Sequence, residues 1–266
     1  MRTGRQNTLS ARNRYRSHPS CLANYSKVME QASFETRISG LHWSEVESEL
    51  NEHGGALLGQ LLTESECSEL IATYDSETSF RSRVIMARHG FGKGEYKYYK
   101  YPLPEPISEL RTNLYSYLAK MADGWEKALN RDRKFPSTHE SYLRQCHKAG
   151  QRLPTPLILK YQAGDYNCLH RDLYGDMAFP LQVTILLSAP GQDFTGGDFV
   201  LTEQRPRMQS RVEVVPLRQG EAVVFAVNER PVLGSRGVYR VAMRHGVSRI
   251  RSGQRFTLGI IFHDAK

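Results

Sequence analysis

Two histidines and one aspartate have the types and the spacing to hold a metal ion. His170 and Asp172 lie two residues apart, and His245 follows much later in the chain. In extended backbone, alternate side chains point to the same side, so the imidazole of His170 and the carboxylate of Asp172 would converge. A His-x-Asp pair with a distant His is the ligand pattern of a 2-His-1-carboxylate iron site, which leaves metal positions open. The alternative is an ordinary strand histidine beside a turn aspartate.

Arg255 lies ten residues after His245 and opens an apolar strand segment, which favours an inward position. A buried arginine needs an anionic partner, because an unpaired charge is costly to bury. Its planar guanidinium can grip the carboxylate of a 2-oxo acid through two hydrogen bonds. Thr257 is on the same strand face and can add a hydroxyl to that carboxylate pocket. A surface position for Arg255 is the alternative.

The elements that must position these residues fall into two parts. From about 40 to 150 the pattern is helical, with capping-box sequences at 63–66 and 137–140 and apolar residues at three- and four-residue steps between 107 and 121. The remainder is rich in short β-type runs, at 157–161, 181–187, 198–201, 212–215, 222–227, 239–245 and 256–262. The short gaps between these runs leave no room for helical crossovers, which predicts a β-sandwich, jelly roll or barrel.

Composition bounds the class of protein. The chain has 266 residues, a 39% hydrophobic content and a net charge of +8, enough apolar material for one sizeable core. Four scattered cysteines argue against a disulfide framework or a cysteine zinc site. No apolar run reaches the roughly 18 residues of a membrane span, and no secretory signal is visible. We therefore expect a protein without membrane association in the cytoplasm.

The positive charge is concentrated at the two ends of the sequence. Residues 1–28 carry six basic and no acidic side chains, and residues 200–266 carry 12 basic against five acidic. We expect residues 1–28 to form a disordered basic tail; a transit peptide, with Met29 as an alternative start, is the other interpretation. We expect residues 29–150 to form a helical region and residues 151–266 to form the β domain.

These residues resemble the motif of the 2-oxoglutarate/Fe(II)-dependent dioxygenases, and the likeness at the core is to the prolyl 4-hydroxylases. In that branch a tyrosine about ten residues before the first histidine helps to hold 2-oxoglutarate, and Tyr161 occupies this place; a core aromatic is the alternative. A Gly-Gly pair before a strand matches Gly196 and Gly197. The resemblance implies an α+β fold, a double-stranded β-helix (jelly roll) with the N-terminal helical region packed on it.

Residues 43–264 further resemble a prokaryotic oxygenase family whose name proposes oxidative removal of methyl groups from damaged DNA. Segments 170–176, 205–211 and 244–249 carry this closer likeness. The AlkB-type DNA demethylases have a second arginine six residues after the one that binds 2-oxoglutarate, and this chain has Ile261 there. The departure leaves a protein or peptide prolyl hydroxylase as the second hypothesis, and a metal-binding β-sandwich without catalysis as the third.

The resemblance implies an enzyme whose catalytic groups are those of the metal site. Fe(II) would be held by His170, Asp172 and His245, and 2-oxoglutarate by Arg255, Tyr161 and Thr257. 2-Oxoglutarate and O₂ would be consumed, with ascorbate as an expected reductant, and succinate and CO₂ released as a substrate C–H bond is hydroxylated. An N-methyl group hydroxylated in this way is lost as formaldehyde, whereas a hydroxylated proline ring persists.

Two segments are candidates for contact with nucleic acid. One interleaves aromatic and basic residues, as single-stranded nucleic-acid binders do: Tyr96, Lys97, Tyr98, Tyr99 and Lys100. An amphipathic edge strand gives the same pattern. The other is the cluster of Arg205, Arg207 and Arg211, for which a solvated charged face is the alternative.

Overall fold

The computed structural model describes residues 32–172 and 175–266, so the predicted basic tail lies outside the described residues. Residues Phe34–Lys266 form one compact unit. Its helical elements are α2 (Phe34–Ser39), α3 (Trp43–His53), α4 (Glu64–Ala72), η2 (Thr73–Asp75), η3 (Met86–His89), α5 (Glu105–Ala128) and α6 (His139–Lys148). No helix in the described ranges is long and apolar enough to cross a membrane.

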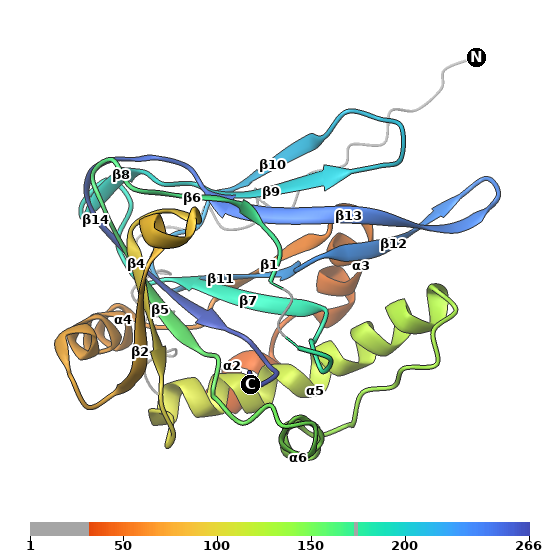
Figure 1. The fold of residues 1–266 in the computed structure, drawn as a ribbon, viewed down its shortest axis with the longest axis horizontal. Coiled ribbons are helices and arrows are strands. Elements are labelled where there is room, and N and C mark those ends of the chain that lie inside the picture. Colours follow the sequence, from red (N-terminus) through yellow and green to blue (C-terminus); the bar gives the residue numbers. More distant parts are fainter. Residues whose placement is uncertain (1–31, 173–174) are drawn as a thin grey trace. The chain divides into compact units, whose positions relative to one another are not determined.

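The strands form two antiparallel sheets (Figure 1). The larger sheet has the order β1-β11-β7-β14-β5-β4-β2, with β8 paired to β14. Its strands are β1 (Gly55–Gln60), β2 (Phe80–Ile85), β4 (Glu95–Tyr99), β5 (Leu157–Gln162), β7 (Leu181–Leu186), β8 (Phe194–Gly196), β11 (Glu221–Ala226) and β14 (Ile250–Ile260).

The smaller sheet has the order β10-β9-β13-β6-β3, with β12 paired to β13. Its strands are β3 (Gly92–Lys93), β6 (Tyr166–His170), β9 (Phe199–Gln204), β10 (Arg211–Val215), β12 (Glu229–Gly234) and β13 (Gly237–Val247). Phe199 on the smaller sheet packs against Phe225 on the larger one, with ring centroids 5.0 Å apart. The two sheets therefore face each other, which confirms the predicted antiparallel β architecture.

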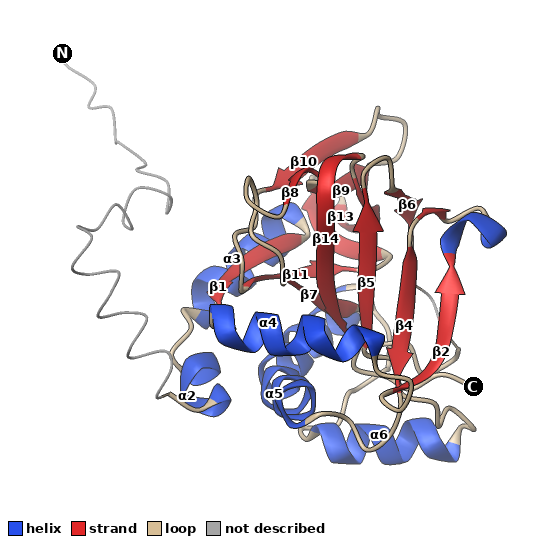
Figure 2. Ribbon diagram, turned by 90° about the vertical axis from the view of Figure 1, so that its left-hand side faces the viewer, coloured by secondary structure: helices blue, strands red, loops and turns tan. Residues whose placement is uncertain are grey.

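Alternation along the strands of the larger sheet separates two cores. On β11, Ala222 and Val224 pack towards the helices, whereas Val223 and Phe225 pack towards the smaller sheet. Figure 2 shows α4, α5 and α6 gathered on one side of the strands. A strand buried on both faces is largely apolar, and Thr184 on β7 and Arg255 on β14 are buried polar exceptions. Residues on the second face of β11, β7, β14 and β5 line the space between the sheets, where the candidate site lies.

The helical region corresponds only in part to the prediction, because four strands lie within residues 29–150. β1 pairs with β11, and β4 pairs with β5, so this region extends the larger sheet at both ends. The predicted helix at 107–121 is confirmed as the centre of α5. The capping box of α4 is confirmed at Thr63 and Glu66, whereas α6 is capped by Thr138 through Ser141 without a reciprocal glutamate.

A buried ion pair attaches α5 to the C-terminal end of the chain. The guanidinium of Arg111 is 1% exposed and lies 2.8 Å from the fully buried carboxylate of Asp264. It also donates to the carbonyl oxygens of Ile261 and His263. Each polar group of this pair has partners, as buried charges require.

Candidate metal and cosubstrate site

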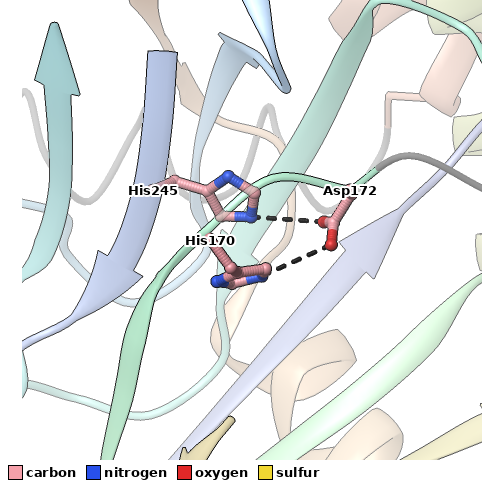
Figure 3. Close-up of side chains that lie close together, drawn as sticks. All are labelled: His170, Asp172 and His245. Carbon is pink, nitrogen blue, oxygen red and sulfur yellow. Dashed lines mark ion pairs between the residues drawn. The ribbon is translucent and has the colours of Figure 1, made fainter. Parts of the chain in front are cut away.

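His170, Asp172 and His245 converge in the space between the sheets (Figure 3). His170 is the last residue of β6, and it lies directly opposite His245 in the antiparallel pairing of β6 with β13. Each of the three residues offers one ligand atom, and these atoms lie within 4.8 Å of one another. Sheet register therefore brings together residues that are distant in the sequence, and two nitrogens and one oxygen are the donor set that suits Fe(II).

The carboxylate of Asp172 lies between the two imidazoles. Its Oδ1 is 3.3 Å from Nε2 of His170, and its Oδ2 is 3.2 Å from Nε2 of His245. Nδ1 of His170 donates to the carbonyl oxygen of Cys168 at 2.8 Å, which leaves the Nε2 lone pair for a metal. Nδ1 of His245 is buried without a hydrogen-bond partner among the described residues. The carbonyl of Cys168 thus sets the tautomer of His170, and the ligand atoms of all three residues converge.

The electrostatics of the triad favour the metal-binding forms of Asp172 and His245, whereas those of His170 favour a bound proton that a metal ion would have to displace. Burial alone would raise the pKa of the Asp172 carboxyl, but the His245 and His170 rings lower it well below its usual range. Burial lowers the pKa of His245 in spite of the nearby carboxylate. At His170, burial acts in the same direction, but the neighbouring Asp172 carboxylate and the backbone contacts of the ring together outweigh it and raise the pKa. An ionised carboxylate and neutral imidazoles are what a divalent cation requires.

Arg255, Thr257 and Tyr161 lie together on adjacent strands. Arg255 on β14 pairs directly with Tyr161 on β5, and one of its nitrogens donates to Oγ1 of Thr257. Its guanidinium carbon lies 5.8 Å from the centroid of the Tyr161 ring and 5.7 Å from that of Phe194. Tyr161 is within electrostatic range of both Arg255 and Asp172, so its fully buried ring connects the two parts of the site.

The guanidinium of Arg255 is buried without an anion. The residue is 1% exposed, its Nε has no hydrogen-bond partner, and it forms no ion pair in the parts of the chain that are described. Burial lowers its pKa to about 10. Arg111 is buried equally well but is paired with Asp264. Of these two buried arginines, Arg255 is the one that still lacks a carboxylate.

The Gly-Gly pair gives Arg255 the room that it needs. Gly197 has a φ of +66°, and a Cβ atom there would lie 3.0 Å from Cδ of Arg255 and 2.3 Å from Cδ1 of Ile250. Any larger residue would have to displace the Ile250 side chain, at 2.3 Å, and would crowd the stem of Arg255, at 3.0 Å, because both distances are below a normal contact between carbon atoms. The glycine is therefore a packing requirement of the candidate carboxylate pocket.

Sequence analysis did not identify Gln182, which belongs to the same space. It lies on β7 between Leu181 and Val183, which face the helices, and its buried Oε1 has no hydrogen-bond partner among the described residues. Thr184 follows it on the same face and donates to the carbonyl of Leu258 at 3.3 Å. Polar residues at alternate positions of an otherwise apolar strand are the signal that could have indicated them.

The aromatic and basic segment, except for Lys100, belongs to β4, which lies between β2 and β5 and is therefore not an edge strand. Its alternation separates the residue types. Lys97 donates to the carbonyl of Tyr74 at 2.6 Å and lies over that ring, whereas Tyr96 and Tyr98 contact each other edge to face on the opposite side. Tyr96 packs against the core between the sheets. The lysine and the tyrosines do not form one mixed surface.

The predicted arginine cluster is divided by ion pairs. Arg205 and Arg211 both pair with Glu203, at 2.6 and 3.4 Å, and the same carboxylate also binds the buried Arg230. Arg207 forms no ion pair with any residue that the structure describes. Of the three predicted side chains, only Arg207 keeps its charge uncompensated by a contacting carboxylate.

Solved structures of prolyl hydroxylases share this fold. The chain is 15% identical to a prolyl hydroxylase from Trichoplax adhaerens, determined with a hypoxia inducible factor oxygen degradation domain peptide fragment, with a TM-score of 0.50 and 94% of each chain covered. It is 15% identical to a prolyl 4-hydroxylase from Phytophthora capsici, with a TM-score of 0.51 and coverage of 87% of this chain and 66% of the other. The fold is thus that of the prolyl hydroxylases.

Sequence comparison then defines the family. A model of the Oxygenase-NA family, described as an oxygenase catalysing oxidative methylation of damaged DNA, matches residues 94–265. Uncharacterised proteins from the CDC 1551 and H37Rv strains of Mycobacterium tuberculosis are each 49% identical over 164 residues, 62% of this chain and 70% of theirs. The chain belongs to the Oxygenase-NA family, which confirms the resemblance found in the sequence.

Proposed function

We propose that this protein is an Fe(II)- and 2-oxoglutarate-dependent dioxygenase that couples oxidative decarboxylation of 2-oxoglutarate to hydroxylation of a C–H bond. The observation that carries the proposal is the buried guanidinium of Arg255, which forms no ion pair with any described residue and lies in the same inter-sheet space as three converging metal ligands. An unpaired buried charge is costly. A dicarboxylate ligand that reaches from the metal to this arginine would remove that cost.

The residues have separate tasks in this proposal. His170, Asp172 and His245 would hold Fe(II), and Arg255 would bind the distal carboxylate of 2-oxoglutarate with two parallel hydrogen bonds. Thr257 and Tyr161 would supply hydroxyl groups beside that carboxylate, and Gln182 would add an amide. When bound, the iron would supply the one-electron and O₂ chemistry that amino-acid side chains lack. Phe199 and Phe225 would keep water from the reacting groups, with ascorbate as the reductant that maintains Fe(II).

For the substrate, we propose an alkylated nucleic acid whose N-methyl group is hydroxylated and released as formaldehyde. The description of the Oxygenase-NA family names damaged DNA, which supports a nucleic-acid substrate. The second candidate is prolyl hydroxylation of a protein or peptide, which the shared fold with prolyl hydroxylases favours. A metal-binding module without catalysis is the third. The same metal site serves both reactions, so the substrate has to be argued from surfaces outside it.

One experiment separates these candidates. The chain is loaded anaerobically with Fe(II) and 2-oxoglutarate, O₂ is admitted, and succinate, formaldehyde and hydroxyproline are measured with methylated oligonucleotides and with proline-containing peptides. We expect succinate and formaldehyde with a methylated oligonucleotide, and neither above background with its unmethylated counterpart. Hydroxyproline without formaldehyde would select the second candidate. No succinate with any substrate, together with unchanged metal binding after His170→Ala, would select the third.

A further inference from the structure

A basic pocket of about 360 Å³ lies beside the metal ligands, on the other face of the smaller sheet. Its lining includes Arg171, Arg205, Arg207, Glu229, Arg240 and Ala242. On β13 the buried residues Val241, Met243 and His245 alternate with Arg240 and Ala242, which line the pocket. Arg171 is exposed between His170 and the buried Asp172. The pocket is therefore separated from the metal ligands by the thickness of one strand layer.

Guanidinium groups outnumber carboxylates in and around this pocket. Glu203 is shared by Arg205, Arg211 and Arg230, and Glu229 is shared by Arg131 and Arg240. The contact of Arg240 with Glu229 is long, at 3.8 Å. Arg171 and Arg207 form no ion pair within residues 32–172 and 175–266. A concave site with unpaired planar guanidinium groups matches an anion with several oxygen atoms, and phosphate fits this description best.

The backbone at Arg207 provides a second, independent observation. The turn from β9 to β10 has Pro206 at its second position and Arg207 at its third, and the amide of Met208 donates to the carbonyl of Arg205 at 3.3 Å. Arg207 has a φ of +62°, which is the conformation that this position of a type II turn requires and that glycine adopts most easily. An arginine is strained here, and strained residues of this kind concentrate at ligand sites.

We propose that this pocket binds a phosphate group, with Arg171, Arg207 and Arg240 as the contacting side chains. In Figure 1 the β9–β10 and β12–β13 hairpins extend in the same direction. Residues of both hairpins line the pocket. Two sources share this chemistry: the backbone of a nucleic acid strand, and a small phosphorylated molecule. The idea that the pocket contacts the substrate rests on the proposed function. Phosphate binding by itself requires neither a metal ion nor turnover.

The test compares variants of the full chain for binding without added iron or 2-oxoglutarate. Fluorescence anisotropy measures the affinity for a labelled single-stranded oligonucleotide of roughly a dozen nucleotides over a range of salt concentrations. Calorimetry measures the affinity for inorganic phosphate. The variants are Arg207→Gly, which removes the guanidinium and relieves the positive φ, and Arg240→Gln. Arg218→Gln, at an exposed arginine outside the pocket, is the matched control.

We expect Arg207→Gly to weaken oligonucleotide binding about tenfold, the effect of losing one charged hydrogen bond. In this variant the slope of log affinity against log salt concentration should become shallower by about 0.7, which is the value for one phosphate contact to a single strand. Arg218→Gln should change neither quantity. Thermal unfolding provides the check on folding, because a glycine at this φ leaves the variant at least as stable as the parent chain.

If Arg207→Gly and Arg240→Gln weaken the binding of inorganic phosphate alone, the pocket serves a small phosphorylated ligand and its phosphate chemistry is upheld. Parent-like affinity of both variants for both probes at every salt concentration would overturn the proposal. Failure of the parent chain to form succinate would overturn the proposed dioxygenase function and leave these binding results unaffected, so the two hypotheses fail separately.

Discussion

Replacing Arg255 by glutamine should raise the stability of the ligand-free chain and, at the same time, destroy its affinity for 2-oxoglutarate. Burial lowers the pKa of the guanidinium from 12.5 to about 10. At neutral pH the group is charged in both the folded and the unfolded chain, so this shift corresponds to a cost of about 3 kcal/mol in the folded state. Glutamine removes the charge but leaves a small void, for which we allow about 1 kcal/mol. We therefore expect a gain of roughly 2 kcal/mol.

The affinity should change in the opposite direction. Truncating one partner of a buried, hydrogen-bonded charge pair costs about 2–5 kcal/mol, so Arg255→Gln should weaken 2-oxoglutarate binding at least about 30-fold. Urea unfolding without ligand measures the stability, and calorimetry with 2-oxoglutarate and redox-inert Mn(II) measures the affinity. A purely structural Arg255 would give the reverse pattern, with lower stability and unchanged binding.

Arg111→Gln is the matched control, because Arg111 is also 1% exposed but is paired with Asp264. Loss of the Arg111 guanidinium would leave the buried Asp264 carboxylate without its ion pair and the carbonyls of Ile261 and His263 without their donor. This should destabilise the chain by about 3–5 kcal/mol. If the two variants lose similar amounts of stability, the inference that Arg255 awaits an anionic ligand is refuted.

Three further predictions concern neighbouring groups. His245→Ala removes one of three candidate ligands and should weaken Mn(II) binding, measured by calorimetry, more than about 100-fold; parent-like affinity would exclude it as a ligand. Tyr161→Phe should weaken 2-oxoglutarate binding about three- to tenfold without changing Mn(II) affinity, whereas an unchanged affinity would make Tyr161 a core aromatic only. Burial and the nearby Arg111 lower the pKa of His139 from 6.5 to about 3, so the unfolded chain binds more protons between these values and stability falls as the pH decreases through this range. His139→Gln should remove about 2 kcal/mol of the stability lost between pH 7 and pH 5 in urea titrations, and a pH dependence equal to that of the parent chain would contradict this reasoning.

The strands of the β domain could be predicted where their side chains alternate or remain apolar, and missed where they do not. β7 and β11 are largely apolar and were located to within a residue or two of their observed bounds. β6 has the sequence YNCLH, whose polar and apolar residues follow no period of two. β12 contains Pro231, which counts against a strand. Both depend on pairing with β13, a long-range contact that no local pattern records.

The strands in the N-terminal region were missed for a related reason. β1 includes Gly55 and Gly59, and β2 includes Arg81 and Arg83, so neither has the composition of a typical strand. They form because the larger sheet offers free hydrogen-bonding edges beside β11 and β4. Tertiary structure, rather than local preference, supplies their stability.

The candidate ligands could be named from the sequence because their chemistry depends on residue type and spacing. The contacts that surround these residues could not be predicted from the sequence. That Glu203 neutralises Arg205 and Arg211, while Arg171 faces the same pocket as Arg207, follows from the register of β9 with β13. The sequence showed an arginine cluster, and the folded chain decides which of its members keep an uncompensated charge.

The central claim is that His170, Asp172 and His245 hold a catalytic Fe(II) beside a 2-oxoglutarate site. The most direct test is an anaerobic Fe(II) titration of the chain with 2-oxoglutarate present, followed by admission of O₂ and measurement of succinate, for the parent chain and for Asp172→Ala. The account predicts that succinate formation saturates at one Fe(II) per chain and disappears in Asp172→Ala. Equal succinate formation by both chains, or none by the parent chain with any substrate, would contradict it.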